Sequence, residues 1–225
     1  MGCRLQKNHK NIFYTALLFF TFLFISCAQT VPELSAVNYS VVFDYVETSD
    51  YPSARLCVFI ESKTDVRRYD SLKVVTPESD LFWLVENLEL FTKNGKEWLG
   101  YSNLTLPQEK ELSEGAYKAI LISADEKEAS SDFNLTYNKD LYKIRKNDVA
   151  QYFANRNGVL NTAVFDEEHV LLYYGAKKSE WKQEERILLK YPTAKSFREV
   201  WILSDNKEIC ILPEKNIEFE KEVSQ

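Results

Sequence analysis

Apolar and polar residues alternate along much of the chain, and this alternation predicts short β-strands. Between Val37 and Tyr45 apolar residues recur at every second position, which places them on one face of a strand. Further apolar runs closed by turn-forming residues predict seven more strands: Leu56–Ile60, Asp70–Thr76, Leu81–Val85, Leu88–Thr92, Glu97–Tyr101, Tyr117–Ile122 and Phe133–Tyr137.

The clearest turn signal is Asn94-Gly95, which lies between two of these predicted strands. Both residue types tolerate the positive φ angles of a two-residue type I′ turn. The sequence therefore predicts a hairpin over Leu88–Tyr101. A second turn, at 124–127, is acidic and separates the last two predicted strands.

The pattern changes after residue 137. Asp148 is placed to cap a short helix with Val149, Tyr152 and Phe153 on one face, and Gly158 is placed to end it. Four apolar runs predict two hairpins: Val159–Phe165 with Val170–Tyr174, and Glu199–Leu203 with Glu208–Leu212. The segment Ser179–Tyr191 suits either a helix or a strand, and residues 214–225 are expected to be a polar tail.

The segment Leu112-Ser113-Glu114-Gly115-Ala116-Tyr117 resembles the tyrosine corner of immunoglobulin-like sandwiches. In that motif a Tyr hydroxyl bonds to backbone just upstream. The resemblance implies that Tyr117 is buried at the start of a strand. The residue two positions later is Ala119 rather than the cysteine of antibody domains, so a sandwich here lacks the inter-sheet disulfide.

The fold class that follows is mainly β: an immunoglobulin-like β-sandwich followed by a smaller β-rich (α+β) C-terminal region. We expect the sandwich over 35–137 and a C-terminal domain with a short helix over 138–213, followed by the tail at 214–225. Residues 1–26 are expected to be a signal peptide, and 27–34 a linker.

The N-terminus carries an export signal. Arg4, Lys7 and Lys10 precede the apolar run Ile12–Ile25, whose length suits a signal-peptide core better than a bilayer span. The alternative is an uncleaved membrane anchor.

The run continues into Leu23-Phe24-Ile25-Ser26-Cys27, which resembles the lipobox of bacterial lipoproteins in the relaxed form typical of spirochaetes. Phe24 and Ser26 depart from the stricter pattern, which has Leu and then Ala or Gly at these positions. The resemblance implies cleavage before Cys27, acylation of its thiol by palmitate-type chains, and a location in the bacterial cell envelope, outside the cytoplasm, on the inner or outer membrane.

Charge argues against nucleic acid as a partner. Loss of residues 1–26 reduces 28 basic residues to 25, against 34 acidic ones, a net charge of −9. Such a surface repels phosphate backbones and gains nothing at an anionic membrane. The expected membrane attachment therefore depends on the lipid.

Two cysteines remain after Cys27. Cys57 and Cys210 both lie in apolar, strand-like runs. They are interpreted as buried free thiols, and the alternative is one disulfide that joins the ends of the fold.

No catalytic, metal or cofactor motif emerges. His169 is the one histidine after residue 26, which excludes multi-histidine metal sites, and its acidic neighbours are more typical of a solvated turn than of a cation site. The glycines are scattered and form no phosphate-binding loop. No pair of carboxylates is singled out by spacing.

Aromatic residues are the one surplus, at 14% of the chain. Exposed Tyr and Trp favour binding because they offer large contact area at low entropic cost. Trp98 and Tyr101, beside the Asn94-Gly95 turn, are the first candidates for a contact surface, and Tyr173, Tyr174 and Trp181 are the second. The alternative is that these rings pack inside the fold.

The functional hypothesis is a non-enzymatic, lipid-anchored protein with a binding or structural role and a protein or glycan partner. The competing hypothesis is a lipid-anchored hydrolase that uses carboxylate acid and base groups. A deep pocket with converging acids favours the hydrolase, whereas an aromatic surface favours the binding protein.

Overall fold

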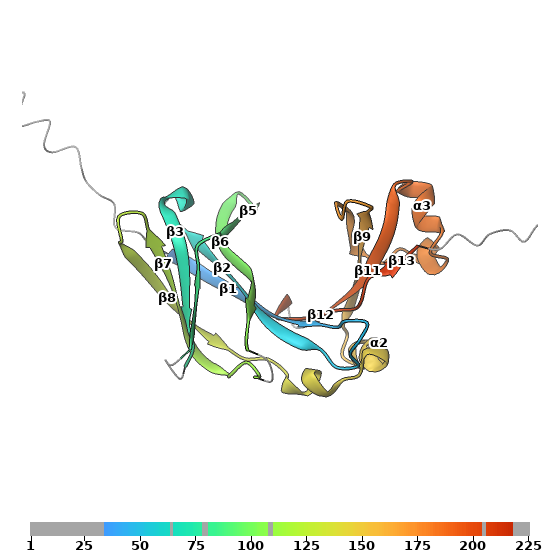
Figure 1. The fold of residues 1–225 in the computed structure, drawn as a ribbon, viewed down its shortest axis with the longest axis horizontal. Coiled ribbons are helices and arrows are strands. Elements are labelled where there is room, and N and C mark those ends of the chain that lie inside the picture. Colours follow the sequence, from blue (N-terminus) through green and yellow to red (C-terminus); the bar gives the residue numbers. More distant parts are fainter. Residues whose placement is uncertain (1–33, 64, 78–80, 108–109, 204–205, 218–225) are drawn as a thin grey trace, which may run out of the picture.

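The computed structural model describes residues 34–63, 65–77, 81–107, 110–203 and 206–217. Cys27 and the predicted signal peptide therefore lie outside the described residues. Strands make up 54% of the structure and helices 15%. The strands form two sheets, which confirms the mainly-β prediction. The structure has two lobes, and the larger of the two sheets is curved and runs through both (Figure 1).

The larger sheet runs through both lobes. Its strand order is β10-β9-β11-β12-β1-β2-β6-β5, and β13 pairs with β11. Its strands are β1 (Leu34–Asp44), β2 (Ser53–Ser62), β5 (Glu89–Lys93), β6 (Lys96–Thr105), β9 (Val159–Asp166), β10 (Leu171–Ala176), β11 (Ala194–Leu203), β12 (Glu208–Ile211) and β13 (Lys215–Asn216).

The smaller sheet packs on the first part of this large sheet. Its order is β4-β3-β7-β8, and all its pairs are antiparallel. Its strands are β3 (Tyr69–Val75), β4 (Phe82–Val85), β7 (Gly115–Ser123) and β8 (Glu128–Leu135). Together with β1, β2, β5 and β6 it forms a two-layer sandwich around one apolar core.

The predicted hairpin at Asn94-Gly95 is confirmed. Lys93 pairs with Lys96 across the turn, and φ is 54° at Asn94 and 74° at Gly95. Positive φ at both central residues is the requirement of a type I′ turn. This turn fixes the register between β5 and β6.

Tyr117 lies as the tyrosine-corner motif requires. It is the third residue of β7, its side chain is 1% exposed, and its hydroxyl donates to the Ser113 carbonyl at 2.7 Å. The ring stacks on Phe133 of the neighbouring strand, with centroids 5.4 Å apart. The predicted position, burial and backbone bond of Tyr117 are confirmed.

The two lobes share one sheet. The last residues of β1 pair in parallel with β12, Val41 opposite Glu208 and Asp44 opposite Ile211. β12 in turn pairs with β11. The C-terminal lobe is therefore attached edge-on to the first strand of the sandwich, at the end of β1 opposite Leu34.

The main hydrophobic core also crosses from the sandwich into the second lobe. The large buried cluster extends from the sandwich to Phe153, Trp201 and Cys210, at the base of the second lobe. A separate small cluster holds the outer part of that lobe: Val164, Trp181, Ile187, Ala194, Phe197 and Ile217.

Six short helices lie between the strands along the described chain. They are η1 (Val66–Arg68), η2 (Lys139–Lys143), η3 (Lys146–Asp148), α2 (Val149–Ala154), η4 (Ser179–Lys182) and α3 (Arg186–Lys190). The ambiguous segment Ser179–Tyr191 thus contains two short helices, η4 and α3, and no strand.

The predicted ends of α2 need correction. Asp148 precedes the helix but makes no capping bond through its side chain, because it already has a helical conformation at the end of η3. At the other end Asn157, with φ of 57°, takes the left-handed conformation. Gly158 follows it and donates its N–H to the Phe153 carbonyl at 2.8 Å.

The expectation of a loose tail from residue 214 is wrong for 214–217. Lys215 and Asn216 pair with β11, and Ile217 is buried in the small core. The Glu214 carboxylate accepts hydrogen bonds from Ser196 and Arg198 of β11, which explains why a polar segment docks here.

Candidate functional site

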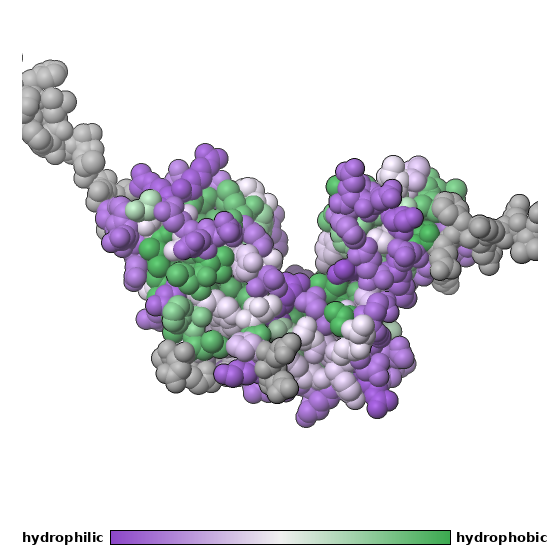
Figure 2. Space-filling model, in the orientation of Figure 1, coloured by the Kyte–Doolittle hydropathy of each residue, from purple (hydrophilic) through white to green (hydrophobic). Residues whose placement is uncertain are grey.

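One face of the large sheet is covered, and the other lines a hollow. The smaller sheet, α2 and the η4–α3 segment all pack on the same face, through the two buried clusters. In Figure 1 these elements lie on the outside of a U-shaped ribbon. The opposite face of the sheet lines the inside of the U, which Figure 2 shows as an open hollow between the lobes.

An aromatic cluster forms one wall of this hollow. Phe59, Phe91 and Trp98 come from the adjacent strands β2, β5 and β6, and they point away from the sandwich core. The Phe91 ring meets the Phe59 ring edge-on, with centroids 4.8 Å apart. It lies parallel to the Trp98 ring, with centroids 6.3 Å apart. Phe91 is 38% exposed, so the cluster offers an apolar surface to a partner.

Gly100 makes room for this cluster. It lies opposite Phe59 in the β2–β6 pair. A Cβ at Gly100 would lie 2.7 Å from the Phe59 Cα and 2.9 Å from its Cδ1, closer than real Cβ contacts. The missing side chain lets the Phe59 ring rest against the neighbouring strand.

The first predicted contact pair is divided between the two faces. Trp98 lies opposite Glu61 on the hollow side, whereas Tyr101 lies opposite Val58 and packs against the sandwich core. Residues an odd number of positions apart in a strand point to opposite sides. Only Trp98 of this pair reaches the hollow.

The second predicted group is divided in the same way. Tyr173 and Trp181 pack edge-to-face in the small core, with ring centroids 4.9 Å apart. Tyr174 points to the hollow, is 51% exposed, and accepts a hydrogen bond from the Asn161 amide at 3.3 Å. Phe59 and Phe91 belong to the same surface and were missed, because the sequence does not show which face of a strand is covered.

The floor of the hollow is an apolar strip. It crosses the three strands that join the lobes, where Val42 lies opposite Ile209 and Val200 opposite Ile211. Val42 and Val200 are only 4% and 6% exposed, although they belong to neither buried cluster of the described residues, whereas Ile209 and Ile211 are partly exposed. The partly exposed apolar surface at the floor is therefore supplied by the isoleucines of β12.

Polar groups close the strip beside the aromatic wall. Arg55 binds the Asp44 carboxylate at 2.6 Å and donates to the Ser102 carbonyl. The Ser102 hydroxyl in turn donates to Glu89 at 2.7 Å. These bonds link four neighbouring strands, β1, β2, β6 and β5, and pair the charge of Arg55 with that of Asp44.

Cys57 lies beside this network and is a free thiol. Burial raises its pKa to about 11, against a smaller lowering by Arg55. The thiol is therefore neutral at physiological pH and a weak nucleophile. Cys210 is also free and is buried on the covered face, where burial raises its pKa strongly. The two cysteines form no disulfide.

Glu214, which directly precedes β13, forms hydrogen bonds with β11. Its carboxylate accepts from the Ser196 hydroxyl and from Arg198, at 3.0 Å from Nη2, and His169 Nδ1 lies 3.5 Å away. The bond from Ser196, followed by those from Arg198, lowers the pKa of Glu214. The group is ionised and paired, which suits a structural role.

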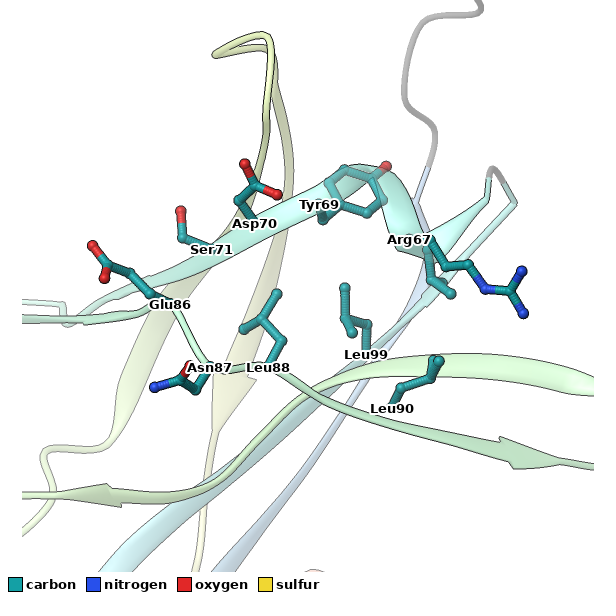
Figure 3. A pocket seen from close by; sticks show the side chains of 10 residues that line it. Arg67, Tyr69, Asp70, Ser71, Glu86, Asn87, Leu88, Leu90 and Leu99 are labelled. Carbon is teal, nitrogen blue, oxygen red and sulfur yellow. The ribbon is translucent and has the colours of Figure 1, made fainter.

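A separate hollow of about 760 Å³ opens between the two layers of the sandwich, near η1 (Figure 3). Leu88, Leu90 and Leu99 line its base, and Asp70 and Glu86 stand at its rim. Its volume falls within the range of small-molecule sites. It is wide open, however, and its acids do not converge on one point in Figure 3.

Among the described residues no group of three or more His, Cys, Asp or Glu side chains is arranged to hold a metal ion. Within the same part of the chain no helix is long and apolar enough to cross a membrane. No protein-family model matches the chain, and a search of curated proteins finds no similar sequence.

Proposed function

We propose that this protein is a lipid-anchored, extracytoplasmic binding protein of a bacterial envelope, and that the hollow between its lobes receives a protein partner. The observation that carries the proposal is the uncovered face of the large sheet. That face places the Phe59–Phe91–Trp98 cluster, the apolar strip and Tyr174 on one concave surface.

An immunoglobulin-like sandwich is part of this proposal. Immunoglobulin domains form one sheet from strands A, B, E and D and the other from C, F and G. Taken in chain order as A, B, C, C′, D, E, F and G, strands β1 to β8 give the sheets A-B-E-D and C′-C-F-G. The corner at Tyr117 then falls on strand F, where the motif belongs.

Anchoring through Cys27 would orient the two lobes. Seven residue-to-residue steps separate Cys27 from Leu34, the first residue of β1. Even fully extended they reach about 25 Å. The sandwich would thus stand near the bilayer, and the second lobe, attached at the far end of β1, would be held away from it.

A protein fits this surface better than a small molecule. The hollow is open and spans two lobes, so it offers area rather than enclosure (Figure 2). Buried aromatic residues dominate the energetics of protein interfaces, with polar groups at the rim. Arg55, Asp44 and Glu89 supply such a rim beside the aromatic wall.

The proposal is tested by photo-crosslinking in cells that make the full chain. A photoreactive phenylalanine analogue replaces Phe91, which is aromatic and exposed, and a matched control replaces Asp132 on the outer side of β8. We expect a protease-sensitive adduct from position 91 and none from position 132. Trp98→Ala in the same chain should reduce that adduct, because it removes half of the stacked pair.

Equal adducts at both positions, or none at position 91, would contradict binding at the hollow. An adduct that resists protease but is cleaved by periodate would show a glycan partner and refute the choice of a protein.

A further inference from the structure

The outer face of the smaller sheet carries exposed apolar residues. Leu72, Val74 and Leu121 belong to the sandwich core, so the positions between them point away from that core. On the edge strand β4, Phe82 and Leu84 point the same way and are 51% and 54% exposed. A sheet face turned to water usually carries polar residues at such positions.

These apolar residues extend over three adjacent strands. Leu84 of β4 pairs with Lys73 of β3, which pairs with Ile120 of β7. In the next row Phe82 pairs with Val75. Directly paired residues point to the same side of a sheet. We call the resulting surface the outer patch, and its apolar members are Val75, Phe82, Leu84, Ile120 and Ile122.

The outer patch ends at the neighbouring strand β8. The core residues of β8 are Ala129, Phe133 and Leu135. Its outward positions are all polar: Glu128, Ser130, Asp132 and Asn134. The apolar surface is therefore bounded on this side, as a contact surface with a polar rim would be.

Lys73 lies in the middle of the outer patch. Its ammonium lies 4.7 Å from the centroid of the Phe82 ring, and it forms no ion pair with another described residue. A long basic side chain can keep its charge in a polar layer while its neighbours enter an apolar one. Lysine beside Phe and Leu is the combination that suits the boundary between phospholipid headgroups and acyl chains.

The size of the outer patch argues against a protein as its occupant. Three strands about 4.8 Å apart and three rows about 7 Å apart give a few hundred Å² at most, with side chains included. A stable protein interface covers about 800 Å² on each partner. A bilayer contact has no such requirement here, because the acyl chains on Cys27 would supply the attachment.

The predicted linker ends close to the outer patch. Leu34 pairs with Ser62, whose hydroxyl lies 3.4 Å from that of Tyr69, and Tyr69 pairs with Ser123. The first residue of β1 and the Ile122 end of the patch thus lie at the same end of the sandwich. Sheets packed about 10 Å apart, with strands about 4.8 Å apart, keep the patch within the roughly 25 Å reach of the linker.

We propose that the outer patch lies on the phospholipid bilayer, with Phe82 and Leu84 against the upper acyl chains and Lys73 among the phosphates. This inference rests on the lipid anchor of the proposed function and adds a second membrane contact to it. The smaller sheet covers one face of the large sheet, and the hollow lies on the other (Figure 1). The hollow therefore stays open to a protein partner.

The test uses the acylated full chain, reconstituted into vesicles of equal parts phosphatidylcholine and phosphatidylglycerol. In a Cys57→Ala background, Leu84→Cys carries a nitrobenzoxadiazole dye, and Leu189→Cys is the matched control, because Leu189 is 84% exposed on α3 of the second lobe. A nitroxide high on the acyl chains quenches only a dye that enters the bilayer. We expect about two-fold quenching at position 84 and none at position 189.

A charge change tests the part assigned to Lys73. Lys73→Glu places a carboxylate among the lipid phosphates and should remove about half of the quenching at position 84. Lys93→Glu makes the same charge change on β5 of the other sheet and should leave the quenching unchanged. Equal quenching in both variants would refute the placement of Lys73 among the phosphates.

Flotation of the same vesicles separates this inference from the anchor. A chain that floats with the vesicles but shows no quenching at position 84 keeps the anchor and overturns the bilayer contact. A chain that does not float refutes both. A dye at position 84 that is blue-shifted yet unquenched would show that protein covers the patch, a second copy if the shift depends on chain concentration, and would also overturn the proposal.

Discussion

Tyr117 offers the most direct test of the sandwich. Tyr117→Phe keeps the ring, with its stack on Phe133, and removes the hydroxyl that donates to the Ser113 carbonyl. Ser113 is half-buried, so water can reach part of the freed carbonyl. The loss should therefore be about 1 kcal/mol in the free energy of unfolding. Tyr117→Ala also leaves a cavity at a residue that is 1% exposed, at a cost of about 3–5 kcal/mol.

Urea unfolding of the purified chain, followed by tryptophan fluorescence and circular dichroism, measures both differences. Tyr174→Phe is the matched control, because Tyr174 is 51% exposed and its hydrogen bond from the Asn161 amide is long, at 3.3 Å. The change in its free energy of unfolding should stay within about 0.5 kcal/mol. If Tyr117→Phe is neutral and Tyr117→Ala costs less than about 1 kcal/mol, Tyr117 supports neither the corner nor the sandwich.

Three further predictions follow from other parts of the chain. Cys27→Ala should abolish incorporation of labelled palmitate, whereas Cys57→Ala should retain it; a wild-type chain that takes up no label would exclude lipidation. Gly100→Val should destabilise the fold by about 1–3 kcal/mol in a thermal melt, because its Cβ would clash with the Val58 carbonyl oxygen and the Phe59 Cα. Gly95→Ala has open space around the new Cβ and reports the turn strain alone. The Cys57 thiol, with its pKa raised from 9.0 to about 11, should react slowly with iodoacetamide at neutral pH and faster as pH approaches 11. Because the neutral thiol is the form that the fold favours, its contribution to stability is complete below pH 9 and lost as pH rises through 11. A reaction rate that is already maximal near pH 8 would contradict this burial.

Part of the candidate surface was accessible from local sequence rules. The two-residue period shows that Trp98 and Tyr101, or Tyr173 and Tyr174, point to opposite sides of their strands. It does not show which side is covered, because that depends on helices and strands distant in the chain. Phe59 and Phe91 were missed for this reason, although both lie in predicted strands.

The sequence by itself determined the features that depend on neighbouring residues. Strand positions follow from alternation, the β5–β6 hairpin from Asn94-Gly95, and the Tyr117 bond from a spacing of four residues. Where a local signal had two solutions it failed: Ser179–Tyr191 suited a helix or a strand, and its burial against β9 and β11 decided for the helix.

Tertiary structure alone decided how the lobes are joined and where the site lies. The pairing of β12 with β1 connects segments from opposite ends of the described chain. Because backbone N–H and C=O groups are the same for almost every residue type, the sequence does not show which strands pair. Residues 214–217 dock for a similar reason, because Ser196 and Arg198 supply partners for Glu214 that a polar segment does not reveal. The concave face exists because the smaller sheet, α2 and α3 all cover one side of a single sheet, and only their packing leaves the other side bare.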